Sequence, residues 1–94
     1  MVVLQIEHPV PNYDGWKKAF ESDPVGRREG GVVGYTIFKT TGAPQCVIVA
    51  LEFARQEQAE AFLESLKRLW GTVEGTIMNS PKARILEVME TYNY

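Results

Sequence analysis

One histidine stands near the start of the chain and is the strongest candidate for proton-transfer chemistry. His8 is the only histidine among the 94 residues, and it follows an apolar stretch that begins at Val2. Its imidazole is the only kind of side chain whose unperturbed pKa lies near neutrality. At a strand end that borders a pocket, it could remove an acidic phenol or enol proton as a general base. The alternative is a half-exposed histidine that bonds to the backbone.

Aromatic side chains recur at helical spacing shortly after this histidine. Tyr13, Trp16 and Phe20 stand at positions i, i+3 and i+7 and therefore share one stripe of a helix. Such a stripe could line a cavity for a flat aromatic ligand, with Phe62 of a later helical segment as another wall. Packing of the helix against a sheet is the alternative use of the same side chains.

Two further side chains could stabilise a negative charge on such a ligand. Arg27 and Arg28 precede a Gly-Gly turn, and an arginine at this place could hold a carboxylate or a phenolate. We assign this role to Arg28, with Tyr35 as a hydrogen-bond donor into the same cavity. The alternatives are a solvated surface pair with Glu29 and simple packing of Tyr35 in a strand.

Composition and charge exclude several classes of function. The formal net charge is −2, and Lys and Arg never occur in runs longer than two, which argues against a basic patch for nucleic acid. The single cysteine, Cys46, cannot form an internal disulfide, and one Cys with one His disfavours a metal site. No apolar run is long enough to span a membrane, and the N-terminus has no basic start. We therefore expect a cytoplasmic protein with one domain, residues 1–94, and no bound metal.

The spacing of apolar residues predicts strands and helices in the order β-α-β-β-α-β. Residues 46–53 are apolar on both faces of a strand, which predicts cover on both sides of the sheet. Asn12 is expected to cap the first helix, and Gly71 is expected just after the end of the second. The predicted strands are residues 2–8, 32–40, 45–53 and 84–92, and the predicted helices are 12–22 and 56–70.

This order predicts an α+β, ferredoxin-like fold with a four-stranded antiparallel sheet. Right-handed crossovers place both helices on one face of the sheet. Leaving the other apolar face in water would forgo free energy comparable to the whole stability of a domain, about 5–15 kcal/mol. Because two-fold homodimers are the commonest oligomers, an identical chain is the simplest cover. We therefore expect a homodimer formed through the open sheet face, in which two sheets close into a barrel with helices outside.

Local sequence matches along nearly the whole chain add a resemblance to this reasoning. They are His8 at the end of the first strand, residues 12–16 with Phe20, residues 26–32, the strand ending at Phe53, an Ala/Glu-rich helix, and residues 83–88. Through these matches the chain resembles the dimeric α/β-barrel superfamily, which includes the antibiotic-biosynthesis monooxygenases. The resemblance implies a homodimeric α/β barrel with a ligand between the sheet and the helices of each subunit.

The resemblance also implies a small-molecule function. The superfamily includes oxygenases of polyketides that need no cofactor, as well as polyketide cyclases. We therefore expect a small apolar or aromatic ligand, no cofactor, and either cofactor-independent monooxygenation or cyclisation. The implied roles are base for His8, anion stabiliser for Arg28 and Tyr35, and cavity wall for Tyr13, Trp16, Phe20 and Phe62.

Two other functions are compatible with the same scaffold. Haem-degrading relatives use an Asn/Trp/His set, but the placement of Asn12, Trp70 and His8 along this chain does not match that set. A non-catalytic binding or stress-response dimer is the main alternative, because His8 is the only plausible acid/base group. Loss of turnover with retained binding in a His8 variant would separate an enzyme from a binding protein.

Overall fold

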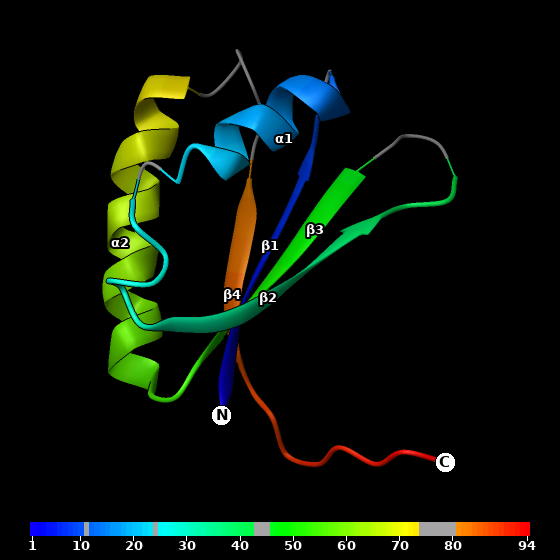
Figure 1. The fold of residues 1–94 in the computed structure, drawn as a ribbon, viewed down its shortest axis with the longest axis vertical. Helices are drawn as coiled ribbons and strands as arrows, with labels where there is room; N and C mark the ends of the chain where they lie inside the picture. The colour runs from blue at the N-terminus through cyan, green and yellow to red at the C-terminus, as the bar shows by residue number, and fades with distance from the viewer. Residues whose placement is uncertain (11, 24, 43–45, 74–80) are drawn as a thin grey trace.

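A computed structural model of the chain describes residues 1–10, 12–23, 25–42, 46–73 and 81–94. The elements follow one another in the predicted order (Figure 1). They are strand β1 (Val2–Pro9), helix α1 (Tyr13–Glu21), strands β2 (Val32–Lys39) and β3 (Cys46–Phe53), helix α2 (Gln56–Val73) and strand β4 (Lys82–Glu87). The α+β, ferredoxin-like fold with a four-stranded antiparallel sheet is confirmed.

The sheet has the strand order β2-β3-β1-β4, with β1 and β3 in the middle. In their register, Leu4 lies opposite Leu51 and Ile6 opposite Val49, so the alternate residues of both strands share one face. All of these are buried, and His8 continues the same row at the end of β1. Because side chains alternate between the two faces of β1, the face that buries Leu4 and Ile6 also buries His8.

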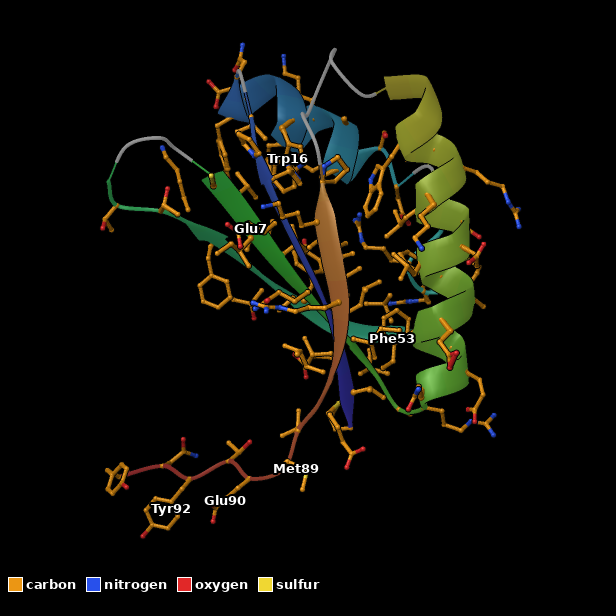
Figure 2. All side chains as sticks on the ribbon, turned by 180° about the vertical axis from the view of Figure 1, so that it is seen from behind. Glu7, Trp16, Phe53, Met89, Glu90 and Tyr92 are labelled. Carbon is orange, nitrogen blue, oxygen red and sulfur yellow. The ribbon has the colours of Figure 1, made fainter. Side chains whose placement is uncertain are left out.

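Both helices cover this same face (Figure 1). Asn12 caps α1 as predicted, because its Oδ1 accepts a hydrogen bond of 3.2 Å from the backbone N–H of Gly15. Helix α2 packs Ala59, Phe62 and Trp70 into the core. In Figure 2, Phe53 lies between the sheet and α2, whereas Glu7 lies on the other side. We call that other side the open face, since neither helix covers it.

The predicted C-terminal ends of strand β4 and helix α2 were wrong. Strand β4 stops at Glu87 rather than at residue 92, because Glu87 already lies opposite Val2, the first residue of β1. The last bond of this ladder joins the Val88 N–H to the Met1 carbonyl at 3.1 Å. Helix α2 continues past Gly71 to Val73, so this glycine lies inside the helix.

The glycine turn before β2 is tighter than its sequence alone indicates. Gly31 has a φ of +97°, a conformation that other residues rarely adopt. At Gly30, an added Cβ would lie 2.5 Å from Cδ1 of Phe62, so the missing side chain lets α2 approach the turn. The ladder between β2 and β3 shifts its register between Val32 and Gly34. Val33, predicted on the same face as Tyr35 and Ile37, is therefore turned toward solvent and is 65% exposed.

Within the described ranges, none of the helices is long and apolar enough to cross a membrane.

We expect Gly30→Ala and Gly71→Ala to change stability in opposite directions. The new methyl at residue 30 must displace the Phe62 ring and should lower the free energy of unfolding by about 1–3 kcal/mol. At residue 71, no atom lies within 4 Å of the added Cβ, so alanine inside the helix should raise it by about 0.5–1 kcal/mol. Urea unfolding followed by circular dichroism measures both values. A destabilising Gly71→Ala would show that the helix ends where the sequence predicted.

Candidate functional site

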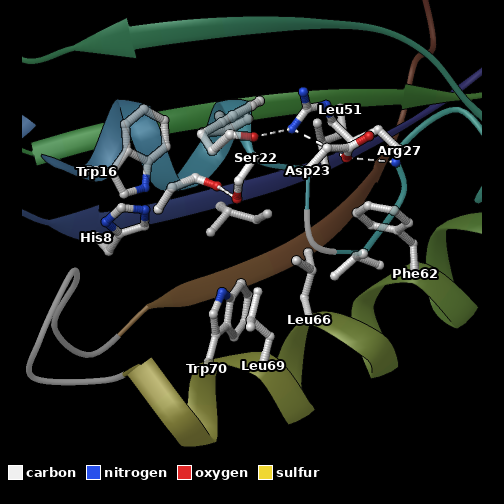
Figure 3. A pocket seen from close by; sticks show the side chains of 15 residues that line it. His8, Trp16, Ser22, Asp23, Arg27, Leu51, Phe62, Leu66, Leu69 and Trp70 are labelled. Atoms are coloured by element: carbon white, nitrogen blue, oxygen red, sulfur yellow. Dashed lines mark hydrogen bonds and ion pairs between the residues drawn. The ribbon is translucent and has the colours of Figure 1, made fainter. Parts of the chain in front are cut away.

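A cavity of about 280 Å³ lies between the sheet and the two helices. Figure 3 shows His8 and Trp16 on one side of it and Leu66, Leu69 and Trp70 of α2 on the other. Its walls are mostly apolar. The lining residues are Ile6, His8, Trp16, Ala19, Phe20, Ser22, Asp23, Val25, Arg27, Val49, Leu51, Phe62, Leu66, Leu69 and Trp70.

His8 is the buried polar side chain of this cavity. Its side chain is only 1% exposed, and its Nδ1 is buried without a hydrogen-bond partner. Burial lowers the pKa of His8 below its ordinary value of 6.5, although the nearby backbone of Pro9 opposes part of this effect. The imidazole is therefore neutral at neutral pH. A buried polar atom without a partner costs free energy, and such an atom is a place where a ligand can bond.

The aromatic residues form a continuous wall beside His8. The Trp16 ring lies 5.7 Å from His8 and 5.3 Å from Phe20, measured between ring centroids. Trp16 and Phe20 meet edge to face, at an interplanar angle of 66°, which is a favourable geometry for an aromatic pair. Phe62 and Trp70 supply aromatic surface from α2. Both tryptophans of the chain thus line the same cavity.

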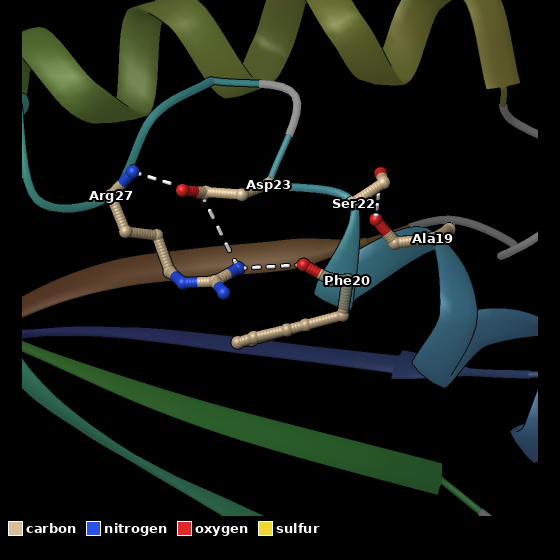
Figure 4. Close-up of polar contacts among 5 residues, drawn as sticks. All are labelled: Ala19, Phe20, Ser22, Asp23 and Arg27. Atoms are coloured by element: carbon tan, nitrogen blue, oxygen red, sulfur yellow. Dashed lines mark hydrogen bonds and ion pairs between the residues drawn. The ribbon is translucent and has the colours of Figure 1, made fainter.

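Arg27 contributes the positive charge of the lining, and its position is fixed by several contacts (Figure 4). Its Nη1 donates a 2.7 Å hydrogen bond to the Phe20 carbonyl and lies 3.5 Å from Oδ1 of Asp23. The same Asp23 oxygen accepts a 2.8 Å bond from the Arg27 backbone N–H. The guanidinium carbon also lies 4.0 Å from the centroid of the Phe20 ring, a cation–π contact. Asp23 adopts a φ of +52° in this turn.

The structure brings together four of the seven predicted site residues. His8, Trp16, Phe20 and Phe62 all line the cavity. The remaining three lie outside the lining. Arg28 is exposed, Tyr13 packs against Trp16 at 5.8 Å, and Tyr35 packs against Phe20 at 4.9 Å.

Sequence reasoning chose Arg28 rather than Arg27 as the ligand-holding arginine, and it did not identify Leu66, Leu69 and Trp70 of α2 as cavity residues. The α2 residues belong to the apolar stripe that predicted the helix, so the pattern placed them on the correct face but gave no sign of a gap beside them. Arg27 and Arg28 are equivalent in sequence. Only the turn at Asp23, which captures the backbone of Arg27, selects between them. Among the residues that the structure describes, no group of three His, Cys, Asp or Glu side chains could hold a metal ion.

Comparison with known proteins gives structural matches only. No protein-family model and no curated protein sequence matches the chain. A dimeric ferredoxin-like protein from an uncultured marine organism is 12% identical, with a TM-score of 0.66 and coverage of 99% of this chain and 98% of the other. The fold is ferredoxin-like. Several of the similar structures are proposed to be antibiotic biosynthesis monooxygenases.

Two of the similar structures contain a bound compound. A monooxygenase from the gene ActVA-Orf6 of Streptomyces coelicolor, in complex with nanaomycin D, is 17% identical, with a TM-score of 0.62 and coverage of 99% and 91%. A MhuD variant with two manganese protoporphyrin IX molecules per active site is 15% identical, with a TM-score of 0.69 and full coverage of both chains. At these identities, the likeness establishes the shared fold.

The lowered pKa of His8 predicts a loss of stability in mild acid. Between the folded-state pKa and the unfolded value of about 6.5, the unfolded chain binds more protons than the folded one. The free energy of unfolding should therefore fall as the pH decreases below about 6.5. Because the chain has one histidine, His8→Asn should flatten this slope between pH 7 and about 5.5. Urea titrations at a series of pH values test it, and equal slopes in both proteins would contradict the burial of His8.

Proposed function

We propose that the protein binds a small, largely apolar aromatic or polyketide-like molecule and oxidises it with molecular oxygen, without a cofactor. The observation that carries this proposal is an apolar cavity with one unpartnered, buried imidazole nitrogen. Its volume of about 280 Å³ is slightly below the range of about 300–1,000 Å³ for small-molecule sites. Apolar walls with few polar groups suit a ligand whose single polar group meets His8.

The state of His8 defines the polar group that the ligand should carry. A neutral imidazole has one nitrogen that donates and one that accepts a hydrogen bond. A hydroxyl can do both, so a phenol or enol can pair with Nδ1 in either tautomer. If Nδ1 is the acceptor, His8 is also placed to take the hydroxyl proton as a general base. Burial makes His8 a weaker base than free imidazole, but it also keeps the side chain unprotonated at neutral pH.

An oxygenation that starts from a phenol needs no external reductant. Removal of the phenolic proton leaves an electron-rich ring, which can react directly with oxygen. One oxygen atom becomes a new carbonyl of a quinone, the other leaves as water, and the substrate supplies all the electrons. The protein binds and orients the substrate, accepts its proton and excludes water. Cyclisation of a polyketide would use the same base but consume no oxygen.

Arg27 replaces Arg28 as the proposed anion stabiliser, because its guanidinium lines the cavity and Arg28 is exposed. A guanidinium has five N–H donors, and the bond to the Phe20 carbonyl and the ion pair with Asp23 both use Nη1. In this proposal Tyr35 acts indirectly. Its ring lies 5.2 Å from the Arg27 guanidinium carbon and 4.9 Å from Phe20, so it supports the wall that holds Arg27.

We further propose that the open face is covered by a second copy of the chain. The face carries apolar side chains, among them Val3, Ile48, Ala50 and the half-exposed Phe38. Polar groups are interspersed, and Arg84 donates a 2.8 Å bond to Gln5, so this polar pair is satisfied within the sheet. Face-to-face packing of two such sheets buries their apolar side chains at a spacing of about 10 Å.

A non-catalytic binding role is the second candidate, and the ionisable groups of the cavity favour it. In the described part of the lining, Asp23 and Arg27 are paired with each other, which leaves His8 as the one free acid/base group. A single base can hold a ligand hydroxyl without any reaction following.

We expect 1-naphthol to bind in the cavity and to quench tryptophan fluorescence, because both tryptophans line it. Ala19→Phe places a ring in the cavity and should weaken binding at least about tenfold by excluding the ligand. Ala61→Phe is the matched control, because Ala61 is an exposed alanine of α2 outside the lining, and it should bind like the wild type. Equal affinities of the two variants would place the naphthol elsewhere.

Oxygen consumption with 1,5-dihydroxynaphthalene distinguishes an oxygenase from a binding protein. Oxidation consumes one O₂ and releases one water for each hydroxynaphthoquinone formed. His8→Asn removes the base and should lower the rate about 10²–10⁴-fold, while binding of the same probe, measured without oxygen, changes much less. Arg28→Ala should keep the wild-type rate, since Arg28 lies outside the cavity. Binding without oxygen uptake by the wild type would favour the non-catalytic role.

A further inference from the structure

The polar groups of the cavity lie at two separate places. In Figure 3, His8 stands beside Trp16, whereas Asp23 and Arg27 stand toward the other side of the cavity. The Trp16 ring contacts the His8 ring at 5.7 Å and the Phe20 ring at 5.3 Å, measured between centroids. The guanidinium carbon of Arg27 lies 4.0 Å from the centroid of Phe20. Two aromatic rings therefore separate the imidazole from the guanidinium.

The register of the sheet gives the scale of this separation. His8 lies opposite Val47. Tyr35 lies opposite Leu51, and its ring is 5.2 Å from the guanidinium carbon of Arg27. Leu51 stands four residues after Val47 in β3, which is about 13 Å at ~3.3 Å per residue. One hydroxyl cannot bond at both places, so a ligand that meets His8 and Arg27 must be elongated, with a polar atom near each end.

The guanidinium of Arg27 has donors left for the second polar atom. The bond to the Phe20 carbonyl and the ion pair with Asp23 both use Nη1 (Figure 4). Among the described residues, Nε and Nη2 of Arg27 have no hydrogen-bond or ion-pair partner. The side chain is only 21% exposed, and a hydrogen bond from a charged donor is stronger than one between neutral groups. The second atom of the ligand should therefore be an acceptor.

Asp23 determines which kind of acceptor fits beside Arg27. Its Oδ1 lies 3.5 Å from Nη1 and also accepts the Arg27 backbone N–H, so a carboxylate is held next to the guanidinium. Both residues line the cavity, and together they carry no net charge. A ligand carboxylate would be attracted by one group and repelled by the other. A carbonyl oxygen accepts the same hydrogen bonds without placing a second negative charge beside Asp23.

A carbonyl at this end also suits the chemistry at His8. In a ligand whose hydroxyl and carbonyl are joined through a conjugated ring system, loss of the hydroxyl proton moves electron density to the carbonyl oxygen. The O–H bond breaks, an N–H bond forms on the imidazole, and the remaining electron pair is shared between the two oxygens. Donors that are already in place where negative charge develops stabilise it. Arg27 would thus stabilise the charge that His8 creates at the other end of the ligand.

We propose that the preferred ligand is an elongated, conjugated hydroxy-ketone, with its hydroxyl at His8 and its carbonyl at Arg27, and that Asp23 disfavours carboxylates at the second position. This proposal rests on the proposed function, because it names the substrate class of the same cavity. His8 accepts the proton, and Arg27 binds the carbonyl. Asp23 acts through Arg27 and sets the specificity.

Two ligands that differ in one oxygen test the carbonyl contact. 6-Acetyl-2-naphthol carries a hydroxyl and a ketone at opposite ends of one conjugated system, and 6-ethyl-2-naphthol has a similar shape without the ketone. In calorimetric titrations, the wild type should bind the ketone at least about tenfold more tightly. Arg27→Gln should abolish this preference, and Arg28→Gln, the same change at the exposed neighbour, should keep it. Equal affinities of the wild type for both ligands, or a preference that survives Arg27→Gln, would overturn the carbonyl contact.

Asparagine at residue 23 tests the specificity without a change at Arg27. It keeps an oxygen for the Arg27 backbone N–H and tolerates the φ of +52°, but it removes the negative charge. Asp23→Asn should bind 6-hydroxy-2-naphthoate at least about tenfold more tightly than the wild type, with a smaller change for the ketone. Glu29→Gln is the matched control, because Glu29 is an exposed acid of the same turn outside the lining. Unchanged naphthoate affinity in Asp23→Asn would refute the role of Asp23.

The same titrations separate a failure of this proposal from a failure of the proposed function. If 6-ethyl-2-naphthol binds to the wild type and Ala19→Phe excludes it, the cavity is a ligand site. Equal affinity for the ketone would then refute the hydroxy-ketone class alone. If neither naphthol binds to the wild type, the proposed function and this proposal are both overturned.

Discussion

The alternation of side chains along β1 is the constraint on which the site depends. A strand gives every second residue to the same face, so the row that contains Leu4 and Ile6 must also contain His8. The register with β3 sets Val47 opposite His8, and Trp16 from α1 packs beside it. The sheet thus holds an ionisable ring in an apolar layer, and neither strand can turn it outward without turning the core outward too.

The cavity lies beside the buried His8, between the sheet and the two helices. Trp16 and Phe20 come from α1, and Phe62, Leu66 and Trp70 from α2, so the lining is shared between two elements that approach the sheet separately. The turn between α1 and β2 closes part of the space through Val25 and Arg27. Gly30 lets this turn contact Phe62 directly. The hydrogen bonds of Asp23 and Arg27 give this wall a fixed shape.

Much of this architecture could be predicted from the sequence, because it follows from periodic patterns. The face of β1 shared by Leu4, Ile6 and His8, the cap at Asn12 and the aromatic stripe of α1 are local features. The structure agrees with each of these predictions. The predictions that failed concern features that are set by residues distant in the sequence. The length of β1 set the end of β4, and a register shift against β3 turned Val33 toward solvent. The choice of Arg27 over Arg28 depended on the capture of one backbone N–H by Asp23.

A protein selected for stability alone would not keep His8 as it stands. The unpaired Nδ1 is of the kind that costs about 1–3 kcal/mol, and the cavity beside it forgoes packing that a larger side chain could supply. An unpaired polar atom and a packing defect at one place in an otherwise well-packed core are typical of a functional site. In the proposed function, the hydroxyl of the ligand supplies the partner that Nδ1 of His8 lacks.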